Sequence, residues 1–198
     1  MNTLNIHKPE IDGRKLRASN SRKKIVNGML SLVQVGDFAP SAEKVAAIAN
    51  VGLRTVFRHF SDMEKLYREM IIEVQNRFMP EVAIPFKSKK WQQQLAEFME
   101  RKSVIYEKIM PYRVAAKFHK HHSSFMKEHL IKWHEIEKNI LLKILPTKIA
   151  EDISLFNALL LSLSFDSWLQ LRLDQGLTPK QAEEVKKKII TALLTDLS

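Results

Sequence analysis

Apolar residues recur at the spacing of an α-helix along most of this 198-residue chain, and few residues interrupt that spacing. The chain has only 5 glycines and 7 prolines, while Ala, Leu, Glu, Lys, Gln and Met fill the stretches between them. These residues favour helix, and few segments alternate between apolar and polar positions as a half-buried strand would. The sequence therefore predicts an all-α fold, with 45% hydrophobic residues available for its core.

The composition excludes several kinds of site. The chain has no Cys, which excludes disulfides, thiolate zinc sites and a cysteine nucleophile and agrees with a reducing cytoplasm. Residues 1–10 lack the apolar stretch of a secretory signal. The longest apolar run, residues 155–171, is too short and too polar to span a membrane. We therefore expect a soluble cytoplasmic protein with no membrane partner and no cofactor.

The formal net charge is +10, and the excess lies towards the N-terminus. Residues 1–60 hold ten Lys or Arg and four Asp or Glu, whereas residues 61–198 hold twenty-two and eighteen. A concentrated positive charge favours a polyanionic partner. A solvated basic surface is the alternative, and charge alone does not decide between them.

The first third of the chain predicts a basic arm and four helices. Residues 1–20 are polar and basic, and we interpret them as a mobile arm. From Arg22 the apolar residues follow helical spacing, and Gly36 is typical of the position after a helix C-cap. Ser41 is a candidate N-cap for a short second helix. A third helix over residues 53–60 follows the turn at Asn50, a residue that tolerates left-handed geometry.

The same helical spacing predicts where the fourth helix begins and which residues of the first third of the chain are buried. Ser61 and Glu64 form a candidate capping box, which predicts that a fourth helix begins there and runs to about Phe78. The predicted core residues of this region share the inner faces of these helices and are Val45, Ile48, Val56, Phe60 and Leu66.

Pro80 and Pro85 predict a domain boundary, which divides the chain into an arm (1–20), a helix-turn-helix domain with its linking fourth helix (21–79) and a larger helical domain (80–198). In the larger domain we expect helices near 89–109, 111–121, 124–145, 149–175 and 178–196. Pro111 suits the first position of a helix, and Thr178 with Gln181 forms a capping box.

Two short helices joined by a tight turn and braced by a longer helix form the helix-turn-helix unit, whose second helix enters the major groove of DNA. Residues 41–60 read SAEKVAAIANVGLRTVFRHF, and SDMEKL follows. This stretch resembles the DNA-binding motif of the TetR family: a Ser or Thr cap, Ile-Ala, a turn, and His-Phe before a fourth helix with Lys-x-x-Leu near its start. The motif covers roughly residues 22–70, and the rest resembles the family only in architecture.

The resemblance implies a role for each matching residue. Leu53, Arg54 and Thr55 would face base edges, with Arg54 suited to a bidentate pair with guanine. Arg58 and His59 would lie near the DNA backbone or an adjacent base, and Ser41 and Lys65 would contact phosphates. Each of these side chains could instead be an ordinary solvated surface residue.

The sequence departs from the family pattern at three positions. Asn50 replaces the turn glycine and Gly52 replaces a serine cap, and both changes are conservative for the backbone. Phe57 replaces a tyrosine whose hydroxyl often touches a phosphate in the family. Phe57 belongs to the same DNA-binding set, with packing as its expected contribution.

Residues 149–173 are apolar on nearly every side, which indicates burial on both faces and favours a homodimer interface in which this segment pairs with the last helix. The predicted interface residues are Leu155, Leu159, Leu163, Val185, Ile189 and Leu193. A core helix buried only within one chain is the alternative. A dimer would place two recognition helices about 34 Å apart, as a palindromic operator requires.

The middle segments carry many aromatic and Met side chains, in the region where the family binds its effector. They could line a pocket or form plain core, and a pocket of this composition would suit an apolar or aromatic small molecule. His119 and His122 are one turn apart, but no carboxylate completes a shell among the neighbouring lysines, so we predict no metal site.

The functional prediction is a one-component transcriptional regulator, acting as a repressor on a palindromic double-stranded DNA operator and released by a small-molecule effector. The alternative is a helical small-molecule-binding protein whose helix-turn-helix is vestigial. Enzymatic activity is not expected, because the sequence has no glycine-rich phosphate loop, no His-Glu-x-x-His motif and no nucleophile elbow.

Overall fold

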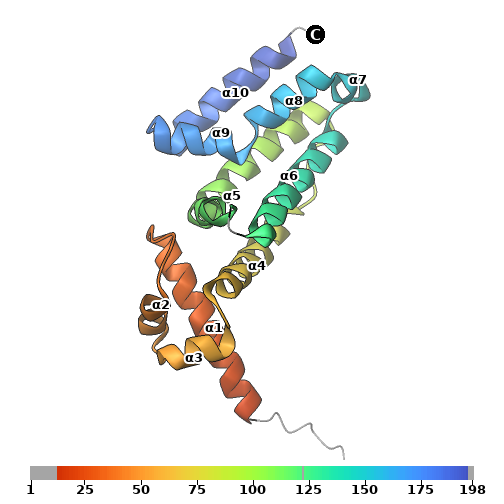
Figure 1. Cartoon of the computed structure of the whole chain (residues 1–198). Helices are drawn as coiled ribbons and strands as arrows, with labels where there is room; N and C mark the ends of the chain where they lie inside the picture. The colour runs from red at the N-terminus through yellow and green to blue at the C-terminus, as the bar shows by residue number, and fades with distance from the viewer. Residues whose placement is uncertain (1–12, 122, 196–198) are drawn as a thin grey trace, which may run out of the picture. The chain divides into compact units, whose positions relative to one another are not determined.

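The computed structural model describes residues 13–121 and 123–195, and the regular elements of that part of the chain are all helical. The predicted all-α fold is confirmed. In chain order (Figure 1) the elements are α1 (Gly13–Gln34), α2 (Ala42–Ala49), α3 (Leu53–His59), α4 (Met63–Val82), α5 (Trp91–His119), α6 (Ser124–Ile144), α7 (Thr147–Glu151), α8 (Ile153–Ser162), α9 (Phe165–Leu169), the π-helical segment Gln170–Asp174 and α10 (Pro179–Thr195).

The chain forms two compact units, one ending at Met70 and the other beginning at Ile71. The division falls within α4. This helix continues through Pro80 to Val82 instead of ending near Phe78 as predicted. Helix α1 also begins earlier than expected. Residues 13–20, assigned to the arm, are helical, and the remainder of the predicted arm lies outside the described residues.

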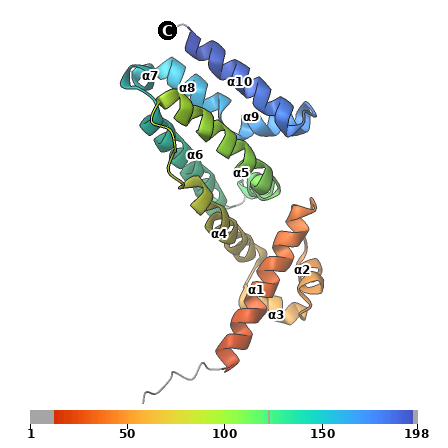
Figure 2. The ribbon, with the colours of Figure 1, turned by 180° about the vertical axis from the view of Figure 1, so that it is seen from behind.

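In unit 1, α1 packs against both α2 and α3 (Figure 2). Its buried stripe follows the predicted spacing, with Ile25, Met29 and Val33 fully buried. Gly36 has a φ of 96°, and the N–H groups of Gly36 and Asp37 donate to the carbonyls of Val33 and Leu32, which closes the helix as predicted.

Helix α4 is capped one residue later than the sequence predicted. The Lys65 N–H donates to Asp62 Oδ1 at 2.9 Å, so Asp62 is the N-cap and the prediction of Ser61 was wrong. The Ser61 hydroxyl instead donates to Asp62 Oδ2. Both residue types cap helices well, and the choice between them depended on where the chain turns into α4.

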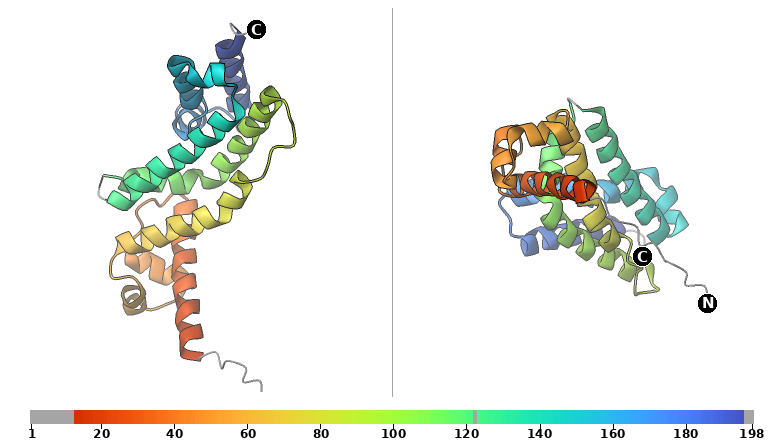
Figure 3. Two further views of the ribbon diagram at one scale, coloured as in Figure 1. Left: turned by 90° about the vertical axis from the view of Figure 1, so that its right-hand side faces the viewer. Right: turned by 90° about the horizontal axis from the view of Figure 1, so that it is seen from below.

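In unit 2, α5 runs uninterrupted through Pro111, which corrects the prediction of two helices meeting there. The later part of α5 is seen nearly end-on in Figures 1 and 2 while its first part lies across the view, so the helix bends along its length. A proline inside a helix removes one backbone hydrogen bond and causes a bend of this kind. Helix α6 packs along α5 (Figure 3).

The single helix predicted over residues 149–175 is broken into shorter pieces. Asp152 accepts from the Leu155 N–H at 2.9 Å and caps α8, and Ser164 accepts from the Ser167 N–H at 3.1 Å and caps α9. Each break therefore has a local cap that the apolar surroundings concealed. The capping box of Thr178 and Gln181 at the start of α10 is confirmed.

The core of unit 2 is formed where α5, α6, α8 and α10 meet. Its most enclosed members are apolar, including Leu141, Leu159, Leu163 and Ile190. None of the described helices is long and apolar enough to cross a membrane.

Candidate nucleic-acid interface

The turn between α2 and α3 has the geometry that the sequence predicted. Ser41 Oγ accepts from the Lys44 N–H and caps α2, as expected. Asn50 is left-handed, with φ 51° and ψ 53°, and the Asn50 and Val51 N–H groups donate to the carbonyls of Ala47 and Ala46. These bonds close α2 and allow α3 to begin at Leu53 after a turn of three residues.

Helices α1 and α2 approach each other closely at Gly28. A Cβ at this position would lie 3.2 Å from the Ala49 backbone nitrogen and 3.3 Å from the Val45 carbonyl oxygen. These are tight contacts with backbone atoms, which cannot move aside as the end of a flexible side chain can. The absence of a side chain at residue 28 therefore sets the distance between the bracing helix and the first helix of the motif.

Helix α3 is divided into a buried and an exposed face. Val56 and the residue after the helix, Phe60, are buried against unit 1, as predicted. The exposed face lies opposite and carries Leu53, Arg54, Phe57 and Arg58, with Thr55 half-buried beside it. Phe57 is 47% exposed, so its ring does not pack in the core and is open to a ligand of α3.

Within the described residues, no carboxylate pairs with the arginines on this face. In the described part of the chain, neither Arg54 nor Arg58 takes part in an ion pair. Lys44 on α2 differs, because it pairs with Asp37 at 2.7 Å. The two arginines of α3 are therefore available to an anionic partner.

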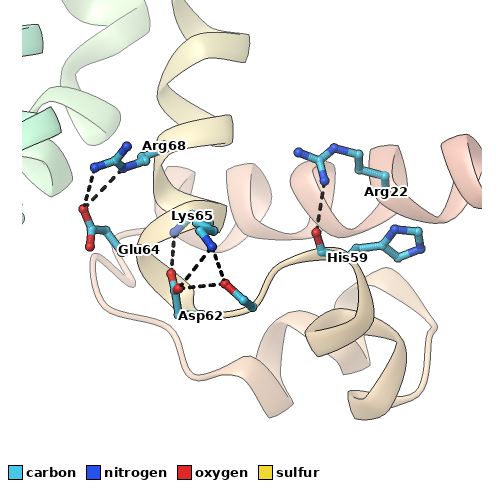
Figure 4. A network of polar contacts seen from close by, with 7 residues as sticks. Arg22, His59, Asp62, Glu64, Lys65 and Arg68 are labelled. Carbon is cyan, nitrogen blue, oxygen red and sulfur yellow. Dashed lines mark hydrogen bonds and ion pairs between the residues drawn. The ribbon is translucent and has the colours of Figure 1, made fainter.

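Arg22, which sequence reasoning treated only as the start of a helix, holds α3 in place. Its Nη1 donates to the His59 carbonyl oxygen at 3.1 Å, which satisfies the C-terminal end of α3 (Figure 4). Its Nε and Nη2 donate to the carboxylate of Glu69 on α4, and its guanidinium lies over the Phe60 ring. No sequence motif marks this contact, because its partners lie 37 and 47 residues away.

His59 is less accessible than the resemblance implied. The ring is half-buried, and its Nε2 is enclosed without a hydrogen-bond partner in the described structure. Burial, followed by the charges of Arg58 and Arg22, lowers the pKa of His59, so the imidazole is neutral near pH 7. It adds shape to this surface and no charge.

Lys65 lies on the exposed first turn of α4, and its ammonium group contacts two residues at the start of that helix. Its Nζ donates to Ser61 Oγ at 2.7 Å and lies 3.9 Å from Asp62 Oδ2 (Figure 4). The Lys65 N–H, followed by the Ser61 hydroxyl, holds the pKa of Asp62 below its usual value. The charge of Lys65 is thus partly balanced by a neighbouring carboxylate, unlike that of Arg54.

Ile48 was predicted to be core, and this was wrong: its side chain is 56% exposed on α2. The sequence pattern placed Ile48 beside Val45, but the buried face of α2 is formed by Val45 and the small residues Ala42, Ala46 and Ala49. Because α2 is short and packs on α1 through alanines, its larger side chain at residue 48 points outward.

The residues predicted for a dimer interface fall into two groups. Leu159 and Leu163 are 0% and 1% exposed, so they belong to the core of unit 2 and cannot meet a partner; this part of the prediction was wrong. Leu155 and Leu193 are half-buried against the same core, Val185 is half-buried, and Ile189 is exposed. The exposed residues of α8 are Ile153, Ser154, Asn157 and Leu161, of which Ile153, Asn157 and Leu161 are spaced four apart.

Unit 2 contains two neighbouring hollows beside α5 and α6, the second of which also reaches the start of α9. The first, here called the inner cavity, has a volume of about 30 Å³ and is lined by apolar residues together with Arg101, Lys102, Tyr106, Arg113 and Glu137. The second, here called the outer cleft, has a volume of about 610 Å³ and is more open. Arg113 and Glu137 line both hollows and lie at their common boundary.

The histidine cluster gives no metal centre in the described structure, where no group of three or more His, Asp or Glu side chains is arranged to hold a metal ion. His121 lines the outer cleft. His122 lies outside the described residues.

No protein-family model and no curated protein matches this sequence. Among solved structures, the chain resembles a transcriptional regulator from Rhodococcus sp. Rha1, with a TM-score of 0.67 and 14% sequence identity over 90% of this chain and 96% of that one. At this identity the likeness concerns the fold. The described part of the chain is all-helical, and its fold is similar to that of this regulator.

Proposed function

We propose that this protein is a TetR-type transcriptional regulator that binds DNA through α3. The observation that carries the proposal is the exposed face of this short helix, with Arg54 and Arg58 outside any ion pair of the described structure. A short helix held by a capped partner and a bracing helix suits insertion into the major groove. The regulator-like fold supports the same reading.

The surface chemistry suggests how the contacts are divided. Arg54 is suited to a bidentate pair with guanine, and the apolar side chains of Leu53 and Phe57 to thymine methyl groups. Ser41 and Lys65, at the N-terminal ends of α2 and α4, are suited to phosphates, which fix the register without reading sequence. Thr55 is half-buried and reaches less far than its neighbours.

A homodimer is part of the proposal, because one recognition helix reads too few base pairs for a specific operator. The outward residues Ile153 (78% exposed) and Leu161 (69% exposed) on α8, with Ile189 (40% exposed) on α10, form the apolar face suited to a second copy. Helices α8 and α10 pack against each other, so a partner that covers both could bury all three residues. A two-fold dimer would read a palindrome.

We further propose that the protein acts as a repressor released by a small molecule bound in unit 2. Release requires that the ligand bind the DNA-free state more tightly than the DNA-bound state, because a ligand with equal affinity for both shifts neither. The inner cavity and the outer cleft are the candidate ligand sites, and both lie within unit 2.

The experiment that tests the proposal is selection of genomic DNA fragments by the purified full chain at near-physiological salt, followed by sequencing. We expect enrichment of a short palindrome, and loss of that enrichment for Arg54→Ala but not for Lys148→Ala, an exposed cation of α7 in unit 2. Equal recovery of random and genomic fragments, with and without small molecules, would contradict the regulator and favour a small-molecule-binding protein whose helix-turn-helix is vestigial.

A further inference from the structure

Three cationic side chains and one carboxylate meet inside unit 2. Lys102 and Lys186 are 7% and 4% exposed, and Arg113 lines the inner cavity beside them. Glu137 supplies the carboxylate, with its Oε2 3.3 Å from Lys102 Nζ and its Oε1 accepting from the Tyr106 hydroxyl at 2.6 Å. The cluster therefore combines three basic side chains with one carboxylate in a region of low dielectric constant.

Several donors of this cluster lack acceptors. In the described structure the buried atoms Arg113 Nε, Arg113 Nη1 and Lys102 Nζ have no hydrogen-bond partner. The Lys102 ammonium has an ion-pair contact with Glu137 and lies over the rings of Phe98 and Tyr106, and the Arg113 guanidinium lies over the Phe165 ring. An ammonium group has three N–H donors, so one carboxylate oxygen cannot satisfy it. Buried donors without partners are costly, and their clustering around one hollow indicates a ligand that accepts hydrogen bonds.

Lys186 differs from Lys102 in that its ammonium donates a hydrogen bond within the chain. Its Nζ donates to the Ser164 carbonyl oxygen at 3.2 Å and lies over the rings of Tyr106 and Trp168. Burial, followed by the charge of Lys102, lowers the pKa of Lys186 to about 7. Burial likewise lowers the pKa of Lys102, and Glu137 opposes that change. Burial therefore disfavours the protonated form of both lysines, and an anion bound beside them would favour it.

The inner cavity has room for a small polar group next to these donors. Its volume of about 30 Å³ exceeds the roughly 10–15 Å³ that one water molecule needs. Its remaining lining is largely apolar and includes Phe98, Ile105 and Trp133. A carboxylate attached to an apolar body matches both the donors and the walls.

The outer cleft, next to the inner cavity, is also lined mainly by basic side chains among its charged residues. It is lined by four cations, Arg113, Lys117, Lys120 and Lys127, and by the carboxylates of Glu137 and Asp166. Both carboxylates are engaged already, since Asp166 accepts from Lys117 at 2.6 Å and Glu137 contacts Lys102 and Tyr106. Leu130, Ile131 and Phe165 supply apolar surface within the same cleft.

We propose that unit 2 binds an organic carboxylate, whose carboxylate group lies between Lys102 and Arg113 and whose apolar body extends into the outer cleft. The inference rests on the proposed function in that this molecule would be the effector. A cationic ligand is disfavoured, because the groups left unsatisfied are donors and the nearby carboxylates already have partners. A neutral ligand would leave the buried charge uncompensated.

The test is isothermal titration calorimetry of the full chain, without DNA, against octanoate, 4-phenylbutyrate and 2-naphthoate, each paired with its neutral amide. We expect at least one carboxylate to bind with a dissociation constant below about 1 mM and at least about tenfold more tightly than its amide, because hydrogen bonds to charged groups are stronger than neutral ones. Acetate and inorganic phosphate are the control ligands, because they are anions without an apolar body. Both should bind more weakly than the three larger carboxylates.

Three variants and one control locate the site. Lys102→Met and Arg113→Met should weaken carboxylate binding about 10- to 100-fold, because each removes charged donors. Lys108→Met is the matched control: it lies on the same helix, but its Nζ contacts Glu81 at the surface and lines neither hollow. Glu137→Gln should leave the affinity unchanged or increase it, since it removes a competing carboxylate; general damage to the fold would lower it.

The proposal is overturned if no carboxylate of the series binds, if amides bind as tightly as acids, or if both cation variants bind like the wild type. Equal binding of inorganic phosphate would overturn the role of the apolar body. Since DNA is absent from this experiment, a negative result leaves the operator selection unaffected, and a failed operator selection leaves this result unaffected.

Discussion

The guanidinium of Arg22 lies 4.3 Å from the ring centroid of Phe60, so the bracing helix α1 holds the end of α3 by a cation–π contact as well as by hydrogen bonds. Arg22→Met should remove these contacts and loosen α3, with a loss of about 1–2 kcal/mol in the free energy of unfolding of unit 1. All three tryptophans belong to unit 2, so the measurement is hydrogen exchange of peptides covering α3. Lys23→Met, its exposed neighbour, is the control. Unchanged hydrogen exchange at α3 would show that the contacts of Arg22 with His59 and Phe60 do not stabilise this helix.

Arg54 and Lys65 should affect DNA binding in different ways. Arg54→Ala should weaken binding to the selected operator by about 1–3 kcal/mol and relax the preference at one base pair. Lys65→Ala should weaken all sequences alike and reduce the salt dependence by about one counterion. Binding isotherms over a range of salt concentrations separate the two effects. Identical behaviour of the two variants would refute the proposed division between base and phosphate contacts.

Gly28 should not tolerate a large side chain. Gly28→Leu would place bulk against the backbone of α2 at Val45 and Ala49, and we expect a destabilisation of about 1–3 kcal/mol. Thermal unfolding followed by circular dichroism measures it, with Lys24→Leu on the exposed surface of α1 as the control. Equal melting temperatures for the two variants would mean that α2 can shift away without cost.

Leu161 and Leu159 lie two residues apart on α8 but should respond differently. Leu161→Glu changes an exposed residue and should raise the dimer dissociation constant by about tenfold or more while the subunit stays folded. Leu159→Ala opens a cavity in the core and should cost about 2–5 kcal/mol of stability. Sedimentation equilibrium and urea unfolding give the two quantities, with Leu142→Glu, an exposed leucine of α6, as the control. A purely monomeric wild type would refute the dimer.

Lys186 should make the stability of unit 2 depend on pH. Its pKa is lowered to about 7 by burial and by Lys102, with Glu137 opposing, so above pH 7 the folded chain releases a proton that the unfolded chain keeps up to about pH 10.5. Stability contributed by this residue therefore rises with pH from about 7, by up to about 1.4 kcal/mol per pH unit, and is lowest below pH 7.

The measurement is urea unfolding followed by tryptophan fluorescence at pH 6 to 9 for wild type and Lys186→Met. The difference between the two free energies of unfolding should move in favour of the wild type as the pH rises. Lys187→Met, the exposed neighbour, should parallel the wild type at every pH. A constant difference between wild type and Lys186→Met would show that Lys186 is not neutralised on folding.

Interactions between residues close in the chain were predictable from the sequence. The caps at Ser41 and Thr178, the left-handed Asn50 and the terminating Gly36 each depend on hydrogen bonds spanning only a few residues. Their energies depend on side-chain type and backbone angle, both of which local sequence specifies. For the same reason the helical character of the chain and the buried stripe of α1 followed from composition and spacing.

The predictions that failed concerned which neighbours a residue meets. Ile48 is exposed because α2 packs through its alanines, and Leu159 and Leu163 are enclosed by other helices of their own chain. An apolar residue suits a core, a partner surface or a ligand equally well, so its periodicity cannot choose among them.

Pairing over long sequence distances was decided only by the tertiary structure. Arg22 reaches His59 and Glu69, and Lys102 meets Glu137 beside Arg113, although no motif links these positions. The sequence by itself determined an all-helical chain with a capped helix-turn-helix, because those features depend on local energies. The tertiary structure decided which surfaces remain exposed and which charges are buried, because burial depends on the packing of distant segments.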